Sequence, residues 1–191
     1  MIFKYVFYFS VIALLVSCGD KPARRPISVK TSTFLKESAK KNKELLTQEE
    51  ALIEAIIKSD SLHTYINSQH GFKYYYIVQQ PDSSYTAQFG DIVTFNYSLS
   101  DLQGNIIYPK KENGYYEHHT DKEELFFGLR SALKLLKENE AGVFYFPSEI
   151  AFGYHGDQYK IGSNEPVRAE IELISIEKVS SPIPVSENQE P

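Results

Sequence analysis

The chain has 191 residues, enough for one domain of ordinary size with extensions at its ends. Its formal net charge of −5 argues against nucleic acid as a partner, because nucleic-acid-binding proteins present clustered lysine and arginine. An apolar fraction of 42% indicates a globular protein. The 14 tyrosines and 12 phenylalanines favour a β-rich one, since aromatic rings pack well on a pleated sheet.

The first residues have the pattern of a secretory signal peptide. An early lysine precedes an apolar run from Tyr5 to Val16, which is shorter than the roughly 20 residues of a permanent membrane span. The run leads into Leu-Val-Ser-Cys, which resembles the lipobox of bacterial lipoproteins, and Cys18 is the only cysteine in the chain. We predict that residues 1–17 are a lipoprotein signal peptide and that Cys18 carries a lipid. The lipid would hold the protein on a membrane facing the periplasm, inner or outer. A plain signal peptide with an incidental cysteine is the alternative.

A tether and a helical extension follow the predicted lipid site. Residues 18–32 contain two prolines and four basic residues without an apolar period, which predicts a solvated tether. Residues 33–70 are predicted to be helical, with a capping box at Thr47 and Glu50 that starts a second helix. Gly71 is in the position of a C-terminal helix stop.

The predicted second helix carries an apolar stripe at i, i+3, i+4 spacing. Its members are Leu52, Ile53, Ile56 and Ile57, with His63 and Ile66 as a possible continuation. Such a stripe needs a partner, either the domain that follows or a second copy of the segment, and we favour the domain.

A β-rich domain is predicted over residues 72–179. The predicted strands are Phe72–Val78, Ile92–Leu99, one starting at Ile106, Val143–Phe146 and one starting at Val167. A hairpin turn is predicted at 101–105, and an irregular loop or bulged edge over 109–121. The alternation of the last strand slips at Leu173 and Ile174, which indicates a β-bulge or burial on two sides.

One helix is predicted inside the domain, over 124–136, with Gly128 near its start and Asn139 as its stop. Strands with one apolar face and a single helix predict an α+β fold, in which a bent antiparallel sheet wraps around one short helix. The fold is preceded by the α-helical N-terminal extension. The Pro/Ser/Glu-rich tail over 180–191 is predicted to be disordered.

The usual catalytic motifs are missing from the sequence. There is no Gly-x-Ser-x-Gly elbow, no phosphate-binding glycine loop and no dinucleotide fingerprint. His118 and His119 are neighbours, but adjacent residues of a strand point to opposite faces, so the pair is a poor chelate. We expect no metal and no cofactor. After these exclusions, the remaining possibility is chemistry that takes place in an apolar pocket.

Residues 90–177 resemble the FK506-binding-protein (FKBP) class of peptidyl-prolyl cis-trans isomerases. The matching segments, in the family's order, are Gly90 to Tyr97, Asp101 to Gly104, Gly128 to Leu136, Phe146 to Gly156, and Glu170 to Leu173. The resemblance implies the same fold of a bent sheet around one helix. With its lipobox, the chain also resembles the gliding-motility-associated isomerase lipoproteins of Bacteroidetes.

The resemblance implies a site for proline-containing polypeptides and isomerase activity that assists the folding of exported proteins. The implied pocket residues are Tyr97, Leu125, Phe126, Leu129, Phe152 and Ile161. Ile161 would offer its backbone N–H to a substrate carbonyl. The alternative is a chaperone or interaction module on the same scaffold, with little or no catalysis.

The sequence departs from the family pattern in four places. Tyr108 stands where the family usually has an acidic residue, and Phe152 replaces a tyrosine of the aromatic corner. Gly162 and Ser163 replace a pair of prolines, and Ala169 replaces an aromatic residue of the last strand. These departures predict a change in catalytic rate and in affinity for FK506-type drugs, with the fold unchanged.

Overall fold

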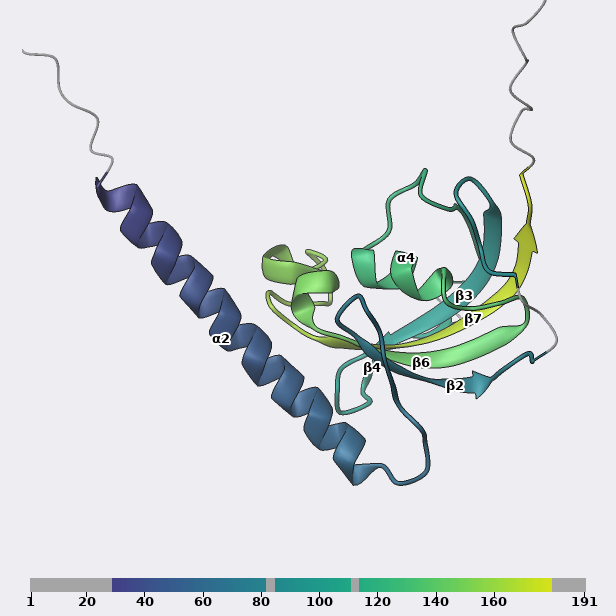
Figure 1. Cartoon of the computed structure of the whole chain (residues 1–191), viewed down its shortest axis with the longest axis horizontal. Helices are drawn as coiled ribbons and strands as arrows, with labels where there is room; N and C mark the ends of the chain where they lie inside the picture. The colour runs from purple at the N-terminus through teal and green to yellow at the C-terminus, as the bar shows by residue number, and fades with distance from the viewer. Residues whose placement is uncertain (1–28, 82–84, 111–113, 180–191) are drawn as a thin grey trace, which may run out of the picture. The chain divides into compact units, whose positions relative to one another are not determined.

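The computed structural model describes residues 29–81, 85–110 and 114–179, with side chains from residue 34 onwards (Figure 1). The predicted signal peptide, Cys18, most of the tether and the C-terminal tail lie outside the described residues. The chain divides into two units, residues 1–40 and 41–191. Every contact discussed below lies within the second unit.

One continuous helix, α2 (Val29–Ser59), occupies most of the predicted helical extension. The predicted capping box is wrong, because Thr47 lies inside the helix and its hydroxyl donates to the Lys43 carbonyl at 2.9 Å. The predicted end at Gly71 is wrong as well. Gly71 lies in the turn between β1 (Ile66–Asn67) and β2 (Lys73–Val78). Its φ of +84° is in the left-handed region, which glycine adopts without strain.

Within the residues that the structure describes, seven strands form one antiparallel sheet. They are β1 (Ile66–Asn67), β2 (Lys73–Val78), β3 (Ile92–Ser100), β4 (Ile106–Tyr108), β5 (Tyr116–His119), β6 (Glu140–Phe146) and β7 (Val167–Glu177). Their order is β1-β2-β6-β7-β3-β4, and β5 also pairs with β3. The predicted strands are present, and the structure adds β1 and β5. The segment that forms β5 was predicted to be an irregular loop or bulged edge.

The predicted bulge of the last strand is confirmed. Thr94 pairs with Ser175 and the next residue, Phe95, pairs with Leu173, so Ile174 is the extra residue of β7. Before this bulge, alternate residues of β7 are buried, including Ala169 and Leu173 at 0% exposure.

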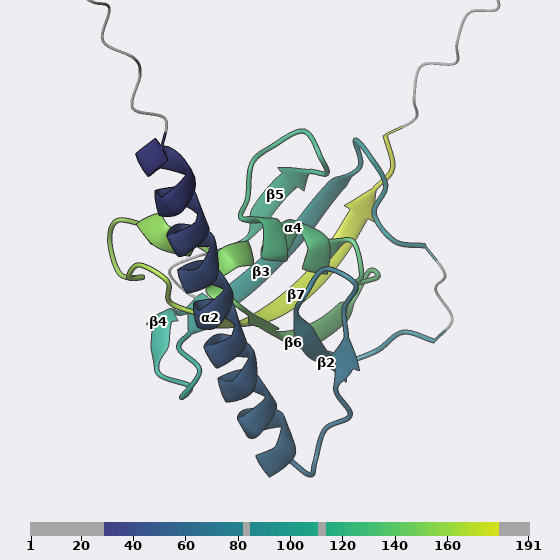
Figure 2. The same ribbon diagram turned by 60° about the vertical axis from the view of Figure 1, so that its left-hand side comes forward.

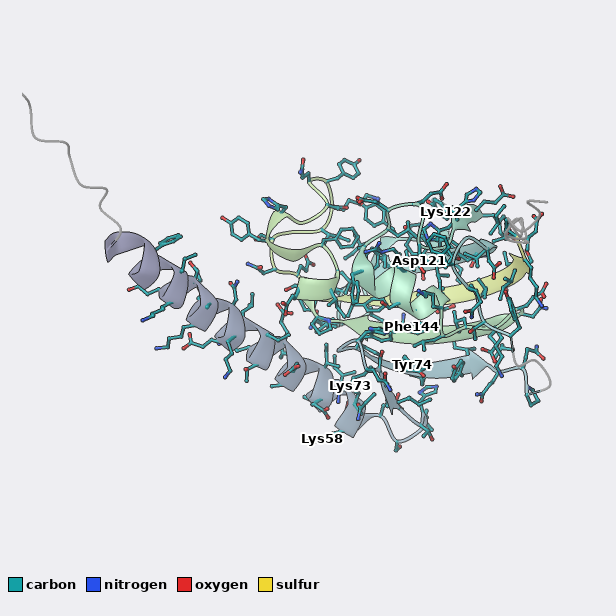
Figure 3. All side chains as sticks on the ribbon, turned by 45° about the horizontal axis from the view of Figure 1, so that its top comes forward. Lys58, Lys73, Tyr74, Asp121, Lys122 and Phe144 are labelled. Carbon is teal, nitrogen blue, oxygen red and sulfur yellow. The ribbon has the colours of Figure 1, made fainter. Side chains whose placement is uncertain are left out.

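The helix α4 (Phe127–Leu133) covers one face of the sheet (Figures 1 and 2). Its Leu129, Ala132 and Leu133 share a buried cluster with Phe144 and Phe146 of β6. Figure 3 labels Phe144 and Tyr74 on neighbouring strands, and their rings stack with centroids 5.3 Å apart. The helix is shorter than predicted, while the predicted stop residue Asn139 has φ +61°.

The second part of α2 packs against the other face of the sheet. Ile53, Ile56 and Ile57 contact a cluster that includes Val143 and Tyr145 of β6. The predicted packing of the apolar stripe on the domain is confirmed for these three isoleucines, whereas Leu52, the fourth predicted member, is 54% exposed. Because β6 is buried on both faces, its residues 141–146 form an unbroken run without charged side chains instead of an alternation, and only the first residue, Glu140, is charged.

Candidate active site

The fold brings the six predicted site residues to one cluster. Leu129 of α4 and Ile161 are buried members of it, with 0% and 2% exposure. The other four are partly buried and pack against the same cluster: Tyr97 of β3, Leu125 and Phe126 just before α4, and Phe152. All six residues thus belong to or border the same cluster, and their role as a binding site stays a prediction.

Aromatic rings line two parts of this cluster. Phe126 contacts Phe152 with ring centroids 4.9 Å apart, and it also contacts Phe146 edge to face with centroids 5.6 Å apart. Tyr97 contacts Tyr116 of β5 at 5.5 Å. The sequence analysis did not select Tyr116. Its signal was an aromatic pair, Tyr115 and Tyr116, inside an otherwise polar stretch.

The Tyr97 hydroxyl keeps its proton at neutral pH. Burial raises the pKa of Tyr97 to about 12, and the neighbouring Tyr116 adds to the shift. Partly buried phenols can donate a hydrogen bond without introducing a charge. The site is thus apolar with a neutral donor at its edge.

Phe152 lies between two short 3₁₀ turns, η1 (Ser148–Ile150) and η2 (Gly153–His155). We call residues 147–155 the corner. The corner is fixed at its first turn by Glu49 of α2, which is only 3% exposed. The Glu49 carboxylate accepts hydrogen bonds from both the backbone N–H and the hydroxyl of Ser148, each at 2.7 Å.

Glu49 was not predicted from the sequence as part of the site. It precedes Ile53 by one helical turn, so it lies in line with the apolar stripe of α2. A carboxylate on a buried stripe requires hydrogen-bond donors, and that was the available signal. Its partner is Ser148, which is remote in sequence, so only the fold identifies it.

The loop after the corner is closed on itself by Asp157. One carboxylate oxygen of Asp157 accepts the N–H groups of Tyr159, Lys160 and Ile161 at 2.9, 2.9 and 2.7 Å. The Asp157 N–H in turn donates to the Ile161 carbonyl at 3.1 Å. This corrects one prediction: the Ile161 N–H already has a partner within its own loop and is not free for a substrate carbonyl in this conformation.

The adjacent histidines lie in different environments. His118 is 4% exposed, whereas the His119 side chain is 43% exposed, as expected for neighbours on strand β5. Burial lowers the pKa of His118, while the Glu123 carboxylate 3.5 Å away acts in the opposite direction. Within the described residues, no group of three or more His, Cys, Asp or Glu side chains is arranged to hold a metal ion.

The sequence of this domain matches a known protein family. Residues 83–174 match the model of the FKBP-type peptidyl-prolyl cis-trans isomerases. Residues 83–174 are an FKBP domain. The predicted family and the predicted reaction class, isomerisation of the bond before proline, are confirmed by this match.

Solved structures show that the fold agrees. A peptidyl-prolyl cis-trans isomerase from Pseudomonas syringae is 18% identical, with a TM-score of 0.56, over 71% of this chain and 96% of that one. FkpA from Escherichia coli is also 18% identical with a TM-score of 0.56, over 89% of this chain and 82% of its own. The comparison with curated protein sequences returns no match. The predicted α+β architecture is confirmed.

Tyr108 stands where the family usually has an acidic residue, and in this structure Asp157 brings a carboxylate next to Tyr108. The Tyr108 hydroxyl donates to the second carboxylate oxygen of Asp157. Burial and this hydrogen bond raise the pKa of Tyr108 to about 12. The Lys160 ammonium lies 4.7 Å from the centre of the Tyr108 ring and donates to the Ile107 carbonyl at 3.3 Å. The loop that contains Asp157 and Lys160 is therefore connected to strand β4 by these contacts.

Proposed function

We propose that the FKBP domain isomerises X–Pro bonds in exported polypeptides, and that it seats the prolyl ring among Tyr97, Phe126 and Phe152, above the buried Leu129. The family match supports the reaction. The proposed seat is supported by one observation above all. Aromatic residues from three separate parts of the chain are left partly exposed around one buried cluster, at a cost in apolar surface that binding would offset.

The physical chemistry of the reaction suits such a site. Resonance holds the amide planar, with a barrier to rotation of about 18–20 kcal/mol. Rotation through the twisted state weakens the resonance and reduces the polarity of the amide. A site that excludes water therefore favours the twisted state over the planar one. No nucleophile and no proton transfer are needed, in keeping with a sequence that has no motif for either.

A protease-coupled assay with a short X–Pro peptide tests the activity. In this assay only the trans peptide is cleaved, so the slow phase reports isomerisation. The full-length protein is expected to shorten the slow phase in proportion to its concentration. A slow phase equal to that of the buffer control at every concentration would exclude catalysis on such peptides.

A second candidate function is a binding module with little catalysis. It is favoured by the Ile161 N–H, whose hydrogen bond to Asp157 removes a donor expected for the substrate. Phe152 also brings no hydroxyl to the corner. The two candidates differ in the same assay, since a binding module would hold proline-containing peptides without shortening the slow phase.

We also propose that the protein is anchored to a membrane facing the periplasm through a lipid on Cys18. The support is the sequence pattern at residues 1–18. In the described parts of the chain, no helix has both the length and the apolarity to cross a bilayer. A place among gliding-motility lipoproteins stays a prediction.

A further inference from the structure

A groove of about 240 Å³ lies between α2 and the corner of the FKBP domain. Its lining includes Leu45, Leu46 and Glu49 from α2, and Ser148, Glu149 and Tyr154 from the corner. We call it the helix–corner groove. Gly153 also lines it, and Gly153 directly follows Phe152, so the groove reaches the residue next to the proposed prolyl site.

The walls of the groove are held together before any ligand binds. Glu49 of one wall accepts two hydrogen bonds from Ser148 of the other, each at 2.7 Å, and all three groups are buried. A groove that is already formed binds an extended segment at a smaller entropic cost than one that must be ordered.

The groove presents apolar surface with an acidic rim. Leu45 and Leu46 are half-buried, while the Tyr154 side chain is 75% exposed. Among the described residues, the lining contains two carboxylates, Glu49 and Glu149, and neither lysine nor arginine. Glu49 is engaged by Ser148, whereas Glu149 is exposed and accessible to a ligand.

We propose that the helix–corner groove binds the part of a client polypeptide that flanks the proline, and that it selects a large apolar side chain next to a basic one. This inference rests on the proposed function of the FKBP domain. Apolar area on α2 and the corner supplies affinity, and the Glu149 carboxylate supplies the preference for a basic residue. The helix α2 is then part of the client-binding surface.

Peptide length tests the proposal. The substrates are an X–Pro tetrapeptide and a decapeptide with the same core, flanked on both sides by Leu and Arg. The groove variant is Leu45→Ala with Leu46→Ala, and the control is Leu52→Ala, on an exposed part of α2 outside the groove. We expect unchanged kcat/KM on the tetrapeptide for both. On the decapeptide, the groove variant is expected to lose about five- to tenfold in kcat/KM, mostly through KM.

A charge reversal at Glu149 tests whether the rim of the groove sets the preference for a basic residue. Glu149→Lys is expected to reverse the preference between decapeptides that carry Arg and those that carry Glu in the flanks. The control Glu138→Lys makes the same charge change at an exposed position outside the groove and is expected to leave the preference unchanged. Thermal unfolding of each variant confirms that the fold is intact before the comparison is made.

The proposal and the proposed function fail in different ways. If the wild type accelerates neither peptide, catalysis is excluded, while fluorescence anisotropy of the labelled decapeptide still reports on the groove. Equal affinity of the groove variant and the Leu52→Ala control for the decapeptide would overturn the proposal. A groove variant that loses activity on both peptides equally would do so too, since the groove would then only support the active site.

Two other occupants of the helix–corner groove would each give a different experimental result. If the groove held a second copy of the chain, the wild type would sediment as a dimer and the groove variant as a monomer. If it held the chain's own tail, removal of residues 180–191 would raise the affinity for the decapeptide. Either result would overturn the assignment of the groove to clients.

Discussion

Asp157 organises the loop that carries Ile161. Its carboxylate accepts hydrogen bonds from three backbone N–H groups and from the Tyr108 hydroxyl. Burial raises the pKa of Asp157, but these hydrogen bonds outweigh burial and hold the pKa below its usual value. The carboxylate is therefore charged at neutral pH, and its contribution to the loop is lost only as the pH falls through that lowered value.

Replacement of Asp157 tests whether this loop positions the site. Asp157→Ala leaves four donors without an acceptor, so we expect kcat/KM for an X–Pro peptide to fall by about tenfold. Asp157→Asn keeps one acceptor oxygen and is expected to recover most of the activity. Isomerase assays on both variants provide the measurement. Equal activity of Asp157→Ala and the wild type would show that the loop is not needed.

Single residues of the site were predictable where the local pattern is distinctive. Tyr97 follows from an alternating strand, and Phe152 from a proline and glycine that frame the corner. Asp157 and Glu49 were not predicted, because each acts through partners that the sequence does not identify. The Ile161 N–H was assigned to a substrate because its competition with Asp157 depends on the conformation of the loop.

The element α2 is joined to the corner by the buried contact between Glu49 and Ser148. Glu49→Ala leaves a buried N–H and a hydroxyl without an acceptor, which is expected to lower the free energy of unfolding by about 1–3 kcal/mol. The neighbouring Glu50 is exposed, and Glu50→Ala is expected to change it by less than about 0.5 kcal/mol. Urea unfolding measures both. Equal stability of the two variants would show that the hydrogen bonds between Glu49 and Ser148 do not stabilise the fold.

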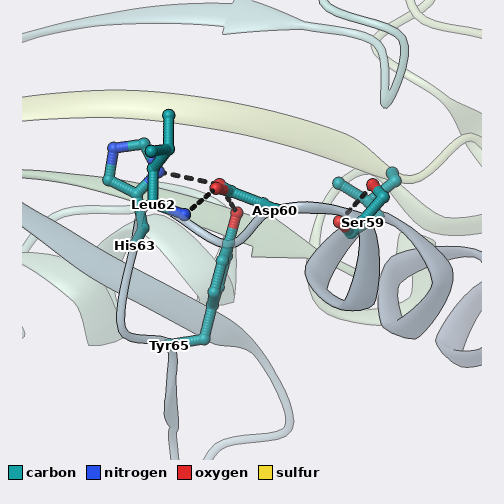
Figure 4. Close-up of polar contacts among 6 residues, drawn as sticks. Ser59, Asp60, Leu62, His63 and Tyr65 are labelled. Atoms are coloured by element: carbon teal, nitrogen blue, oxygen red, sulfur yellow. Dashed lines mark hydrogen bonds and ion pairs between the residues drawn. The ribbon is translucent and has the colours of Figure 1, made fainter.

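The end of α2 is fixed by Asp60 (Figure 4). Its carboxylate lies 2.7 Å from the His63 Nδ1, and it accepts the Leu62 N–H at 2.8 Å and the Tyr65 hydroxyl at 2.9 Å. The hydrogen bond with His63, followed by those from Leu62 and Tyr65, lowers the pKa of Asp60 to about 2.

This carboxylate predicts a specific loss of stability in acid. A lowered pKa in the folded state stabilises the fold above the usual pKa of 3.8 and loses that effect as the pH falls towards 2. The stability difference between the wild type and Asp60→Asn is expected to be constant near pH 5 and to shrink between about pH 4 and pH 2. Urea unfolding across this range measures it. A difference that does not depend on pH would contradict the assignment.

Element boundaries were less predictable than element types. Strands β3 and β7 follow from their alternation, since one face of the sheet is buried under α4, whereas β6 follows from its aromatic and β-branched run. The break predicted at Thr47 failed, because a threonine inside a helix can bond to the carbonyl one turn earlier. Strand β5 was missed because its polar sequence is stabilised by pairing with β3, which is a tertiary effect.

At the scale of the whole molecule, we propose that a lipid on Cys18 sets where the FKBP domain works. A lipidated Cys18 would hold the protein on membranes, and Cys18→Ala is expected to move it to the soluble fraction after cell breakage. Fractionation of cells that express either form measures this. A Cys18→Ala protein that still sediments with membranes would contradict the lipid anchor.

The fold as a whole was predictable because composition, strand alternation and the order of the matching segments agree on one architecture. The central claim is that the partly exposed aromatic cluster binds and isomerises the prolyl bond. It is tested most directly by the kcat/KM of Phe152→Ala on an X–Pro peptide, beside the control Phe89→Ala, whose ring is 70% exposed in the segment before β3. We predict that Phe152→Ala loses about tenfold or more while Phe89→Ala keeps the wild-type value, with both variants folded. Full activity in a folded Phe152→Ala protein would contradict the account.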